Sequence, residues 1–484
     1  MRLPGRLTRP ARGTLSHLGA YLGVGLLVAA AAIALALAVT PLQDTTVAGE
    51  EIGVGAAAPT LSLSGPGEVD LFGQRLPTTL QFAGPVRPRL TPTRITLDRQ
   101  LASMFDPGHG TMPARVAIGH ALAAAWTRYF VWEAAITAAG ALLLTGALCG
   151  WARFPLRKTL VLLGIGLALA EAANLGGIMV TAYTAPARLA QVGSLTGLVG
   201  QAPLPTVARL SGPERSKVQA VVLGDSTAAA LGNPLVAHAS KQDRACGRSS
   251  DAYATDLAAV NDWDVLNLAC SGATIQDGIL GPQQAHGLTV PTQLAEARQA
   301  VNARLVIVSI GANDVGWSGL VGLCAAARSC ADSASTAYFQ QHLNTLASQY
   351  YQLLEQLATL PSHPRVLINL YYNPFDTTRH CLHSEGLDAA KENTLTRLLN
   401  ALNQVLASGA TATSQIPVQP DFTGHAVCDP APYVQGVNSP APFHPTAAGE
   451  LAIALADEQA LQAAQGSPSA TPSAVPSTGP GQSG

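Results

Sequence analysis

An uncharged stretch at residues 18–40 limits the possible folds more than any other feature of this sequence. It consists almost wholly of Ala, Leu, Val, Ile and Gly, and about 20 such residues in a helix cross the ~30 Å hydrocarbon layer of a membrane. Two further apolar stretches, 129–151 and 159–183, are each interrupted by one glutamate. We therefore predict three transmembrane helices.

The first stretch has an alternative interpretation as a cleaved signal peptide. It is longer than the 7–15 apolar residues usual in signal peptides, and no clear cleavage site follows it. We therefore interpret 18–40 as an uncleaved helix. In either case the next segment is delivered outside the cytoplasm.

Two glutamates interrupt the second and third stretches. A carboxylate in lipid is costly unless it is paired or neutral, so it is a functional candidate by default. We favour a structural explanation, in which Glu133 reaches the outer interface and Glu171 faces the other helices, near Asn174.

Positive charges predict the orientation in the membrane. Basic residues precede the first stretch and fill the loop between the second and third: Arg2, Arg6, Arg9, Arg12, Arg153, Arg157 and Lys158. Lys and Arg collect on the cytoplasmic side. This rule places 1–17 and 152–158 in the cytoplasm, and it places 41–128 and everything after about residue 184 outside. A net charge of −2, with both signs scattered, gives no case for a nucleic-acid partner.

The cysteines agree with this topology. One of the seven lies in the second stretch, at Cys149, and the other six follow the last stretch. An even number in an exported domain predicts three disulfides, and spacing alone leaves the pairing open. Since no CxxC occurs and the eleven histidines show no ligand spacing, we predict no metal site.

The outer segment 41–128 is rich in Pro, Gly and Thr. Short alternating runs at 61–64, 79–82 and 94–97 are typical of strands, so a small β domain or an ordered lid is expected. Residues 114–126 predict a helix that runs into the second span.

The chain after the third span divides into three parts. Residues 184–215 are expected to form a linker, and the Pro- and Ser-rich tail 466–484 is expected to be disordered. Between them, 216–465 predicts a flavodoxin-like, doubly wound α/β domain. Its predicted strands are short apolar runs suited to a buried parallel sheet, at 218–223, 265–269, 305–310 and 366–370.

Four residues with catalytic potential follow predicted strands or precede the last helix. In open α/β sheets ligands bind at the carboxyl ends of the strands. Ser226 follows the first strand at a turn into a predicted helix, where backbone N–H groups could support an oxyanion. Gly272 and Asn313 follow the second and third strands, and His444 precedes the last helix. Each alone is more often a cap, a turn residue or a structural histidine, but together they supply a nucleophile, two donors and a base.

This set resembles the SGNH/GDSL hydrolase superfamily, and it is most similar to the actinobacterial secreted esterase branch. The resemblance covers about half of the chain, roughly 217–465. It implies an esterase or lipase without a cofactor, in which Ser226 attacks the ester and His444 transfers the proton. The Ser226 and Gly272 N–H groups and the Asn313 side chain would form the oxyanion hole. The resemblance also implies the disulfide pairs Cys246–Cys270, Cys324–Cys330 and Cys381–Cys428.

One position departs from the superfamily pattern. Most members have Asp three residues before the histidine, where this chain has Ala441. In the branch that it resembles, a main-chain carbonyl can orient the imidazole, and here that would be the carbonyl of Ala441. Asp421 or Asp429 could substitute through space.

Three functions remain open at this point. The leading one is hydrolysis of acyl esters by a multi-pass membrane protein whose catalytic domain faces outward. The second is acyl transfer or deacylation on envelope lipids or acylated glycans, and the third is an inactive envelope-binding protein. Oligomeric state is not predicted.

Overall fold

The computed structural model describes residues 12–47, 50–60, 62–95, 112–189, 192, 198 and 215–466. The predicted linker and the predicted disordered tail fall largely outside these residues. The chain forms two compact units. One consists of Met1–Thr206, Thr336–Leu360 and Gln404–Gln415, and the other of Val207–Ser335, Pro361–Asn403 and Ile416–Gly484.

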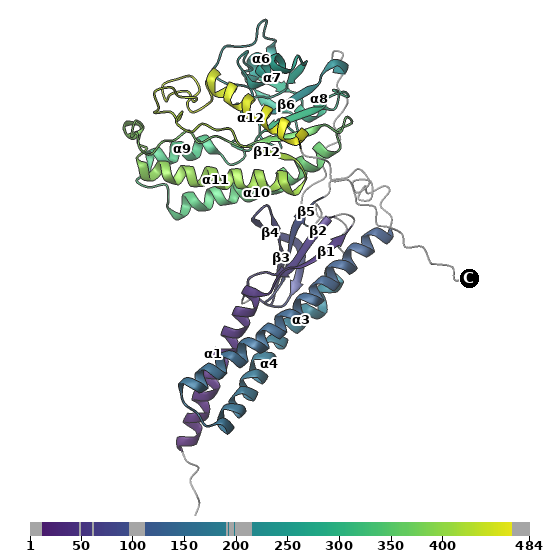
Figure 1. The fold of residues 1–484 in the computed structure, drawn as a ribbon, viewed down its shortest axis with the longest axis vertical. Coiled ribbons are helices and arrows are strands. Elements are labelled where there is room, and N and C mark those ends of the chain that lie inside the picture. Colours follow the sequence, from purple (N-terminus) through teal and green to yellow (C-terminus); the bar gives the residue numbers. More distant parts are fainter. Residues whose placement is uncertain are drawn as a thin grey trace, which may run out of the picture. The chain divides into compact units, whose positions relative to one another are not determined.

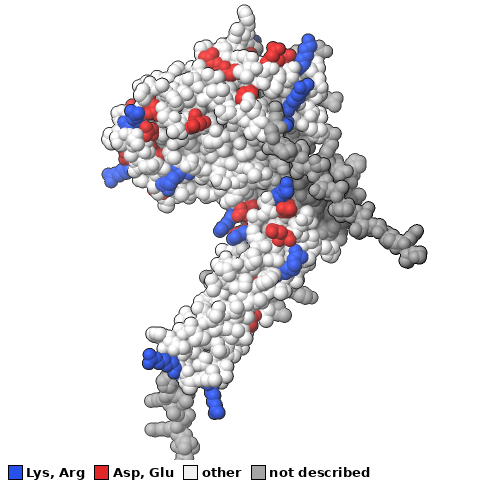
Figure 2. Space-filling model, viewed as in Figure 1, with Lys and Arg blue, Asp and Glu red and all other residues white. Residues whose placement is uncertain are grey.

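Three long helices dominate the first unit: α1 (Arg12–Val39), α3 (Met112–Trp151) and α4 (Leu156–Leu189), which pack against one another (Figure 1). Each contains a stretch apolar and long enough to cross a membrane. The visible face of these helices is almost free of charged side chains over most of its length (Figure 2). As predicted, 114–126 is helical and continuous with the apolar part of α3.

The prediction for Glu133 is wrong. This side chain does not reach an interface but is fully buried between α3 and α4. It accepts hydrogen bonds from Thr137 Oγ1 at 3.0 Å and from Asn174 Nδ2 at 2.8 Å. The amide of Asn174 therefore binds Glu133. A buried carboxylate satisfied by two donors costs far less than a bare one in an apolar setting.

The first unit also contains a five-stranded sheet, which confirms the predicted β-rich segment after the first long helix. Its strands are β1 (Gln43–Val47), β2 (Glu50–Ala56), β3 (Ser64–Leu71), β4 (Gln74–Ala83) and β5 (Pro88–Arg94), in the order β1-β2-β5-β3-β4. Residues of β3 alternate between buried and more exposed positions, because successive side chains of a strand point to opposite faces.

The β3–β4 hairpin turn is strained at its tip. Phe72 has φ +57°, a left-handed conformation that is unusual for a bulky residue. Its ring packs edge-on against Tyr350 in α10 (Ser333–Ala358), with ring centroids 5.9 Å apart. This aromatic contact lies within the first unit.

The second unit contains a parallel sheet of β6 (Ala220–Gly224), β7 (Val265–Asn267), β10 (Leu305–Ser309), β11 (Arg365–Asn369) and β12 (Ile416–Val418). The strand order β12-β11-β10-β6-β7 confirms the flavodoxin-like arrangement. Every residue of β6 and β10 is buried, which explains their continuous apolar runs. Four strands lie where the sequence predicts them, and β12 was not predicted.

The remaining elements connect and cover the strands. They are η1 (Arg215–Lys217), α6 (Lys241–Cys246), α7 (Tyr253–Asn261), β8 (Gln283–Ala285), β9 (Leu288–Val290), α8 (Gln293–Ala297), α9 (Trp317–Ala326), η2 (His383–Glu385), α11 (Ala389–Ala412) and α12 (Ala447–Gly466). Helices α7 and α12 pack together, and their apolar residues join those of the sheet in one core, with Tyr253, Leu257 and Ile453 among its members.

Candidate active site

Ser226 lies in a tight turn directly after β6. Gly224 makes this turn possible, because a Cβ there would come within 2.4 Å of the Ser309 oxygen on the neighbouring strand. The Gln293 side chain binds both the N–H and the C=O of Gly224, at 2.8 and 2.9 Å. No α-helix begins at Ser226, since residues 226–232 form successive turns. The expected support from a helix N-terminus is therefore absent at this position.

The structure brings Ser226 and His444 together across 218 residues of sequence. The Ser226 Oγ lies 2.8 Å from His444 Nε2, and both side chains are half-buried. Pro445 follows the histidine, and α12 begins two residues later. A hydroxyl in this position can pass its proton to the imidazole as it attacks an electrophile.

The prediction that the Ala441 carbonyl orients His444 is wrong. His444 Nδ1 lies 3.1 Å from the carbonyl oxygen of Pro442, whereas the Ala441 oxygen accepts the main-chain N–H of His444 at 3.2 Å. Phe443 has φ +63°, and this turn of the backbone aims the Pro442 carbonyl at the ring. Since a carbonyl only accepts, Nδ1 carries the proton and Nε2 is free to accept from Ser226.

The two aspartates considered as substitutes are engaged elsewhere. Asp421 accepts the N–H of Thr423 at 2.9 Å. Asp429 accepts the N–H of Ala426 at 2.8 Å and forms an ion pair with Arg379 at 3.3 Å. The imidazole is thus oriented by a neutral main-chain group.

Three hydrogen-bond donors were predicted to form the oxyanion hole beside the serine. In the described part of the chain, the N–H groups of Ser226 and Gly272 donate to no other residue. Gly272 has φ +80°, which favours glycine at this turn. Asn313 Nδ2 donates to the Ala273 oxygen at 2.9 Å, and its second hydrogen is left for a ligand. These donors have the chemistry of an oxyanion hole.

Tyr371 connects two of these groups, and sequence reasoning missed it. Its hydroxyl donates to Asp225 Oδ2 at 2.6 Å and accepts the N–H of Ala312 at 2.9 Å. Asp225 precedes Ser226, and Ala312 precedes Asn313. Burial raises the pKa of the Asp225 carboxyl, and the hydrogen bond from Tyr371 opposes that rise. The position of Tyr371 just after β11, at the same sheet edge as the other site residues, was the only signal in the sequence.

Asp314 is a second perturbed carboxyl beside the site. Its Oδ1 accepts the N–H of Ile275 at 2.9 Å, and its Oδ2 is buried without a described partner. Burial raises the pKa of Asp314 to about 7, the nearby charge of Asp225 also raises it, and the Ile275 N–H lowers it. This carboxyl therefore titrates near neutral pH.

Two of the three expected disulfides are formed in the structure, Cys246–Cys270 and Cys381–Cys428. The first joins α6 to the loop that carries Gly272. The third expected pair is not formed, and Cys324 and Cys330 are both free and buried. Burial and a hydrogen bond with Cys330 raise the pKa of Cys324 to about 12. Among the described residues, no cluster of three or more His, Cys, Asp or Glu could hold a metal ion.

Comparisons with known proteins match the part of the chain that contains these residues. Residues 222–452 match the GDSL-like Lipase/Acylhydrolase family. Lipase 1 of Streptomyces coelicolor is 27% identical over 241 residues, which cover 48% of this chain and 81% of that protein. A lipase of Streptomyces rimosus is 26% identical over 252 residues, or 50% of this chain and 86% of that protein. The crystal structure of an extracellular lipase from Streptomyces rimosus covers 50% of this chain and 99% of its own, with 23% identity and a TM-score of 0.43. The chain therefore carries, at residues 222–452, a hydrolase domain of the GDSL-like Lipase/Acylhydrolase family.

Proposed function

We propose that this protein is a membrane-anchored serine esterase that hydrolyses carboxylic acyl esters through Ser226 and His444. The observation that carries this proposal is the 2.8 Å contact between Ser226 Oγ and His444 Nε2, in an imidazole whose Nδ1 faces the Pro442 carbonyl. The family of the domain and the lipases among its relatives support the same chemistry.

The proposed reaction has two steps. Ser226 Oγ attacks the ester carbonyl carbon while its proton moves to His444 Nε2, and the oxyanion accepts hydrogen bonds from the Ser226 N–H, the Gly272 N–H and Asn313 Nδ2. His444 then gives the proton to the departing alcohol, which leaves an acyl-serine. Water attacks this intermediate in the same way, its proton passes through His444 to Ser226, and the acid is released.

The absence of a carboxylate on His444 has a consequence for this mechanism. The Pro442 carbonyl fixes the tautomer but stabilises the imidazolium less than an anion would. The three donors around the oxyanion then contribute a larger share of the transition-state stabilisation.

The Ser226→Ala variant tests the proposal. It removes the nucleophile but keeps the turn, so the protein should fold and lose at least ~10³-fold in turnover of a p-nitrophenyl ester. A variant that keeps the wild-type rate would disprove the role of Ser226.

We further propose that the hydrolase domain faces the outside of the membrane, with spans at 18–40, 129–151 and 159–183. The basic residues between α3 and α4 support a cytoplasmic loop there. Two disulfides support an oxidising compartment for the domain. Protease treatment of intact cells should remove the hydrolase domain and spare the 152–158 loop, and the reverse pattern would contradict this orientation.

Acyl transfer or deacylation on envelope lipids or glycans is a second candidate function. The three apolar helices favour it, because a membrane-anchored enzyme suits an immobile acceptor or substrate. Measuring the products with water alone and with an added alcohol or sugar separates the two. Transfer predicts an ester product at the expense of free acid, whereas hydrolysis predicts acid in both cases.

A further inference from the structure

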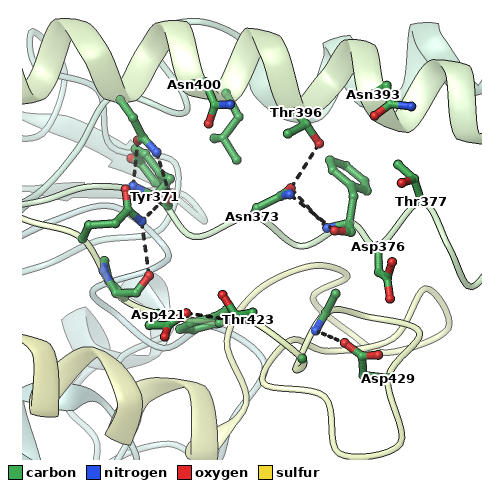
Figure 3. A pocket seen from close by; sticks show the side chains of 18 residues that line it. Tyr371, Asn373, Asp376, Thr377, Asn393, Thr396, Asn400, Asp421, Thr423 and Asp429 are labelled. Atoms are coloured by element: carbon green, nitrogen blue, oxygen red, sulfur yellow. Dashed lines mark hydrogen bonds between the residues drawn. The ribbon is translucent and has the colours of Figure 1, made fainter.

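A cavity of about 720 Å³ lies at the carboxyl ends of β11 and β12. Its size is within the range of small-molecule binding sites. One wall is α11, and the opposite wall is the loop that follows β12, as Figure 3 shows. Ser226 and His444 do not line it.

A row of amide and hydroxyl side chains follows one face of α11. Asn393, Thr396, Asn400 and Asn403 have the spacing i, i+3, i+7 and i+10, which places them on the same side of a helix. Asn393 and Asn400 are exposed, and their side chains make no hydrogen bond to any described residue. Each therefore has two donors and an acceptor available to a ligand.

The opposite wall adds hydrogen-bond acceptors and apolar surface. Asp421 and Thr423 come from the loop after β12, facing the helix (Figure 3). Phe375 and Phe422 also line the cavity and are almost fully buried. The lining thus combines groups that bind hydroxyls with apolar surface that can contact C–H groups.

This lining selects among ligand classes. An acyl chain would cover the free amides of Asn393 and Asn400 without replacing their hydrogen bonds to water, which is unfavourable. An anion would meet the carboxylates of Asp376, Asp421 and Asp429. Arg379 offsets part of the charge of Asp376 and Asp429, and Asp421 keeps acceptor capacity beyond the one main-chain N–H that it binds. A neutral polyhydroxy compound can use both the free amides and these acceptors.

The cavity is connected to the catalytic residues through its walls. The Phe375 ring lies 5.7 Å from the ring of Phe443, which precedes His444. Phe422 stacks on Tyr372 at 4.3 Å, and the Tyr372 hydroxyl donates to the Phe443 carbonyl at 2.8 Å. The cavity therefore adjoins the loop whose histidine returns the proton to the leaving alcohol.

We propose that this cavity binds the alcohol part of the ester and that this alcohol is a neutral polyhydroxy compound such as a sugar residue. The inference rests on the proposed esterase function, and it names a substrate class for that site. It assigns Asn393 and Asn400 as residues that bind the alcohol hydroxyls.

Two esters with the same acyl group provide the test: methyl 6-O-acetyl-glucoside and ethyl acetate. The full-length protein in detergent should show a kcat/KM at least tenfold higher for the sugar ester. In the double variant Asn393→Leu/Asn400→Leu, which keeps side-chain size and removes the polar groups, the ratio of the two kcat/KM values should fall about tenfold. Asn344→Leu is the matched control, because Asn344 is a helical asparagine in α10 outside this cavity.

Direct binding separates this inference from the proposed catalytic function. Calorimetry with the Ser226→Ala protein should detect methyl 6-O-acetyl-glucoside binding, weakened about tenfold by the double substitution. The inference would be overturned if the Ser226→Ala protein did not bind the glucoside. It would also be overturned if the double substitution changed neither the binding affinity nor the ratio of the two kcat/KM values. If the wild-type protein bound the glucoside but hydrolysed no ester, that result would instead count against the proposed function.

Discussion

The hydroxyl of Tyr371 donates a 2.6 Å hydrogen bond to the buried carboxylate of Asp225. The same hydroxyl accepts the N–H of Ala312, so one side chain joins the turn of the proposed nucleophile to the loop of the proposed oxyanion donor Asn313. Its own backbone is held by Asn403, which binds both the N–H and the C=O of Tyr371. The relative position of Ser226 and Asn313 therefore depends on Tyr371.

Tyr371→Phe should lower both stability and turnover. It leaves a buried carboxylate oxygen of Asp225 without its donor, which costs about 1–3 kcal/mol in the free energy of unfolding. We also expect kcat to fall about tenfold with little change in KM, because ~1.4 kcal/mol of transition-state stabilisation is lost when the donors shift. Urea unfolding and steady-state kinetics measure the two effects.

The control for this variant is Tyr350→Phe. The Tyr350 hydroxyl is also buried and donates to the Leu406 carbonyl at 3.0 Å, within the first unit. It should lose stability but keep kcat. Equal kcat values in the two variants would argue against a positioning role for Tyr371.

Asn313→Ala should reduce kcat by about 10²–10³-fold, the usual loss when one oxyanion donor is removed. Because Asn313 also binds the Ala273 carbonyl, the isosteric Asn313→Asp is a needed companion. It keeps the size of the side chain and removes both amide hydrogens. If either variant retains more than a third of the wild-type kcat, Asn313 is not an oxyanion donor.

Asp314 should make stability depend on pH. Its folded pKa of about 7 lies above the ordinary value of 3.8, so the folded protein binds more protons than the unfolded chain between those values. The stabilisation is therefore fully present below about pH 4 and is lost as pH rises toward 7, by up to ~1.4 kcal/mol per pH unit.

Asp314→Asn isolates this contribution. The amide oxygen can still accept the Ile275 N–H, but the side chain no longer titrates. The free energy of unfolding, measured by urea at pH 5 and pH 8, should fall less with pH in the variant than in wild type. Identical pH dependence in the two proteins would show that Asp314 does not titrate in this range.

The Cys246–Cys270 disulfide should support both the fold and the Gly272 loop. Replacing both cysteines by Ser should lower the free energy of unfolding by about 3 kcal/mol, since the bond closes a loop with a sequence separation of 24. The matched pair is Cys381→Ser/Cys428→Ser, which opens a loop with a separation of 47 whose cysteines are far from Gly272 in the sequence. We expect both double variants to be less stable and the first to lose more kcat, which thermal unfolding and kinetics check.

The sequence predicts most of the sheet and the four proposed catalytic groups for a simple reason. Continuous apolar runs identify buried parallel strands, and the carboxyl ends of such strands share one edge. Ser226, Gly272 and Asn313 each follow the end of a strand within about five residues, so strand order predicts that they share one edge of the sheet. The strand β12 was missed because it has only three residues, one of them proline.

The contacts around these groups depend on geometry that the sequence pattern does not contain. The positive φ of Phe443 determines which carbonyl faces His444. As a result the Pro442 oxygen, and not the predicted Ala441 oxygen, contacts His444 Nδ1. Glu133 and Glu450 are fully buried, although charged residues usually prefer exposed positions. Each accepts a hydrogen bond from a partner distant in sequence, Glu133 from Asn174 and Glu450 from the Tyr253 N–H. The second carboxylate oxygen of Glu450 is buried without a described partner.

Labelling with a fluorophosphonate probe, followed by mass spectrometry of the labelled peptide, tests the central claim most directly. The probe reacts with a serine only when a neighbouring base activates it. The account predicts covalent modification of Ser226 in the folded wild-type protein, strongly reduced labelling in His444→Ala, and none at this site in Ser226→Ala. A folded wild-type protein that stays unlabelled at Ser226, or one labelled equally well without His444, would contradict it.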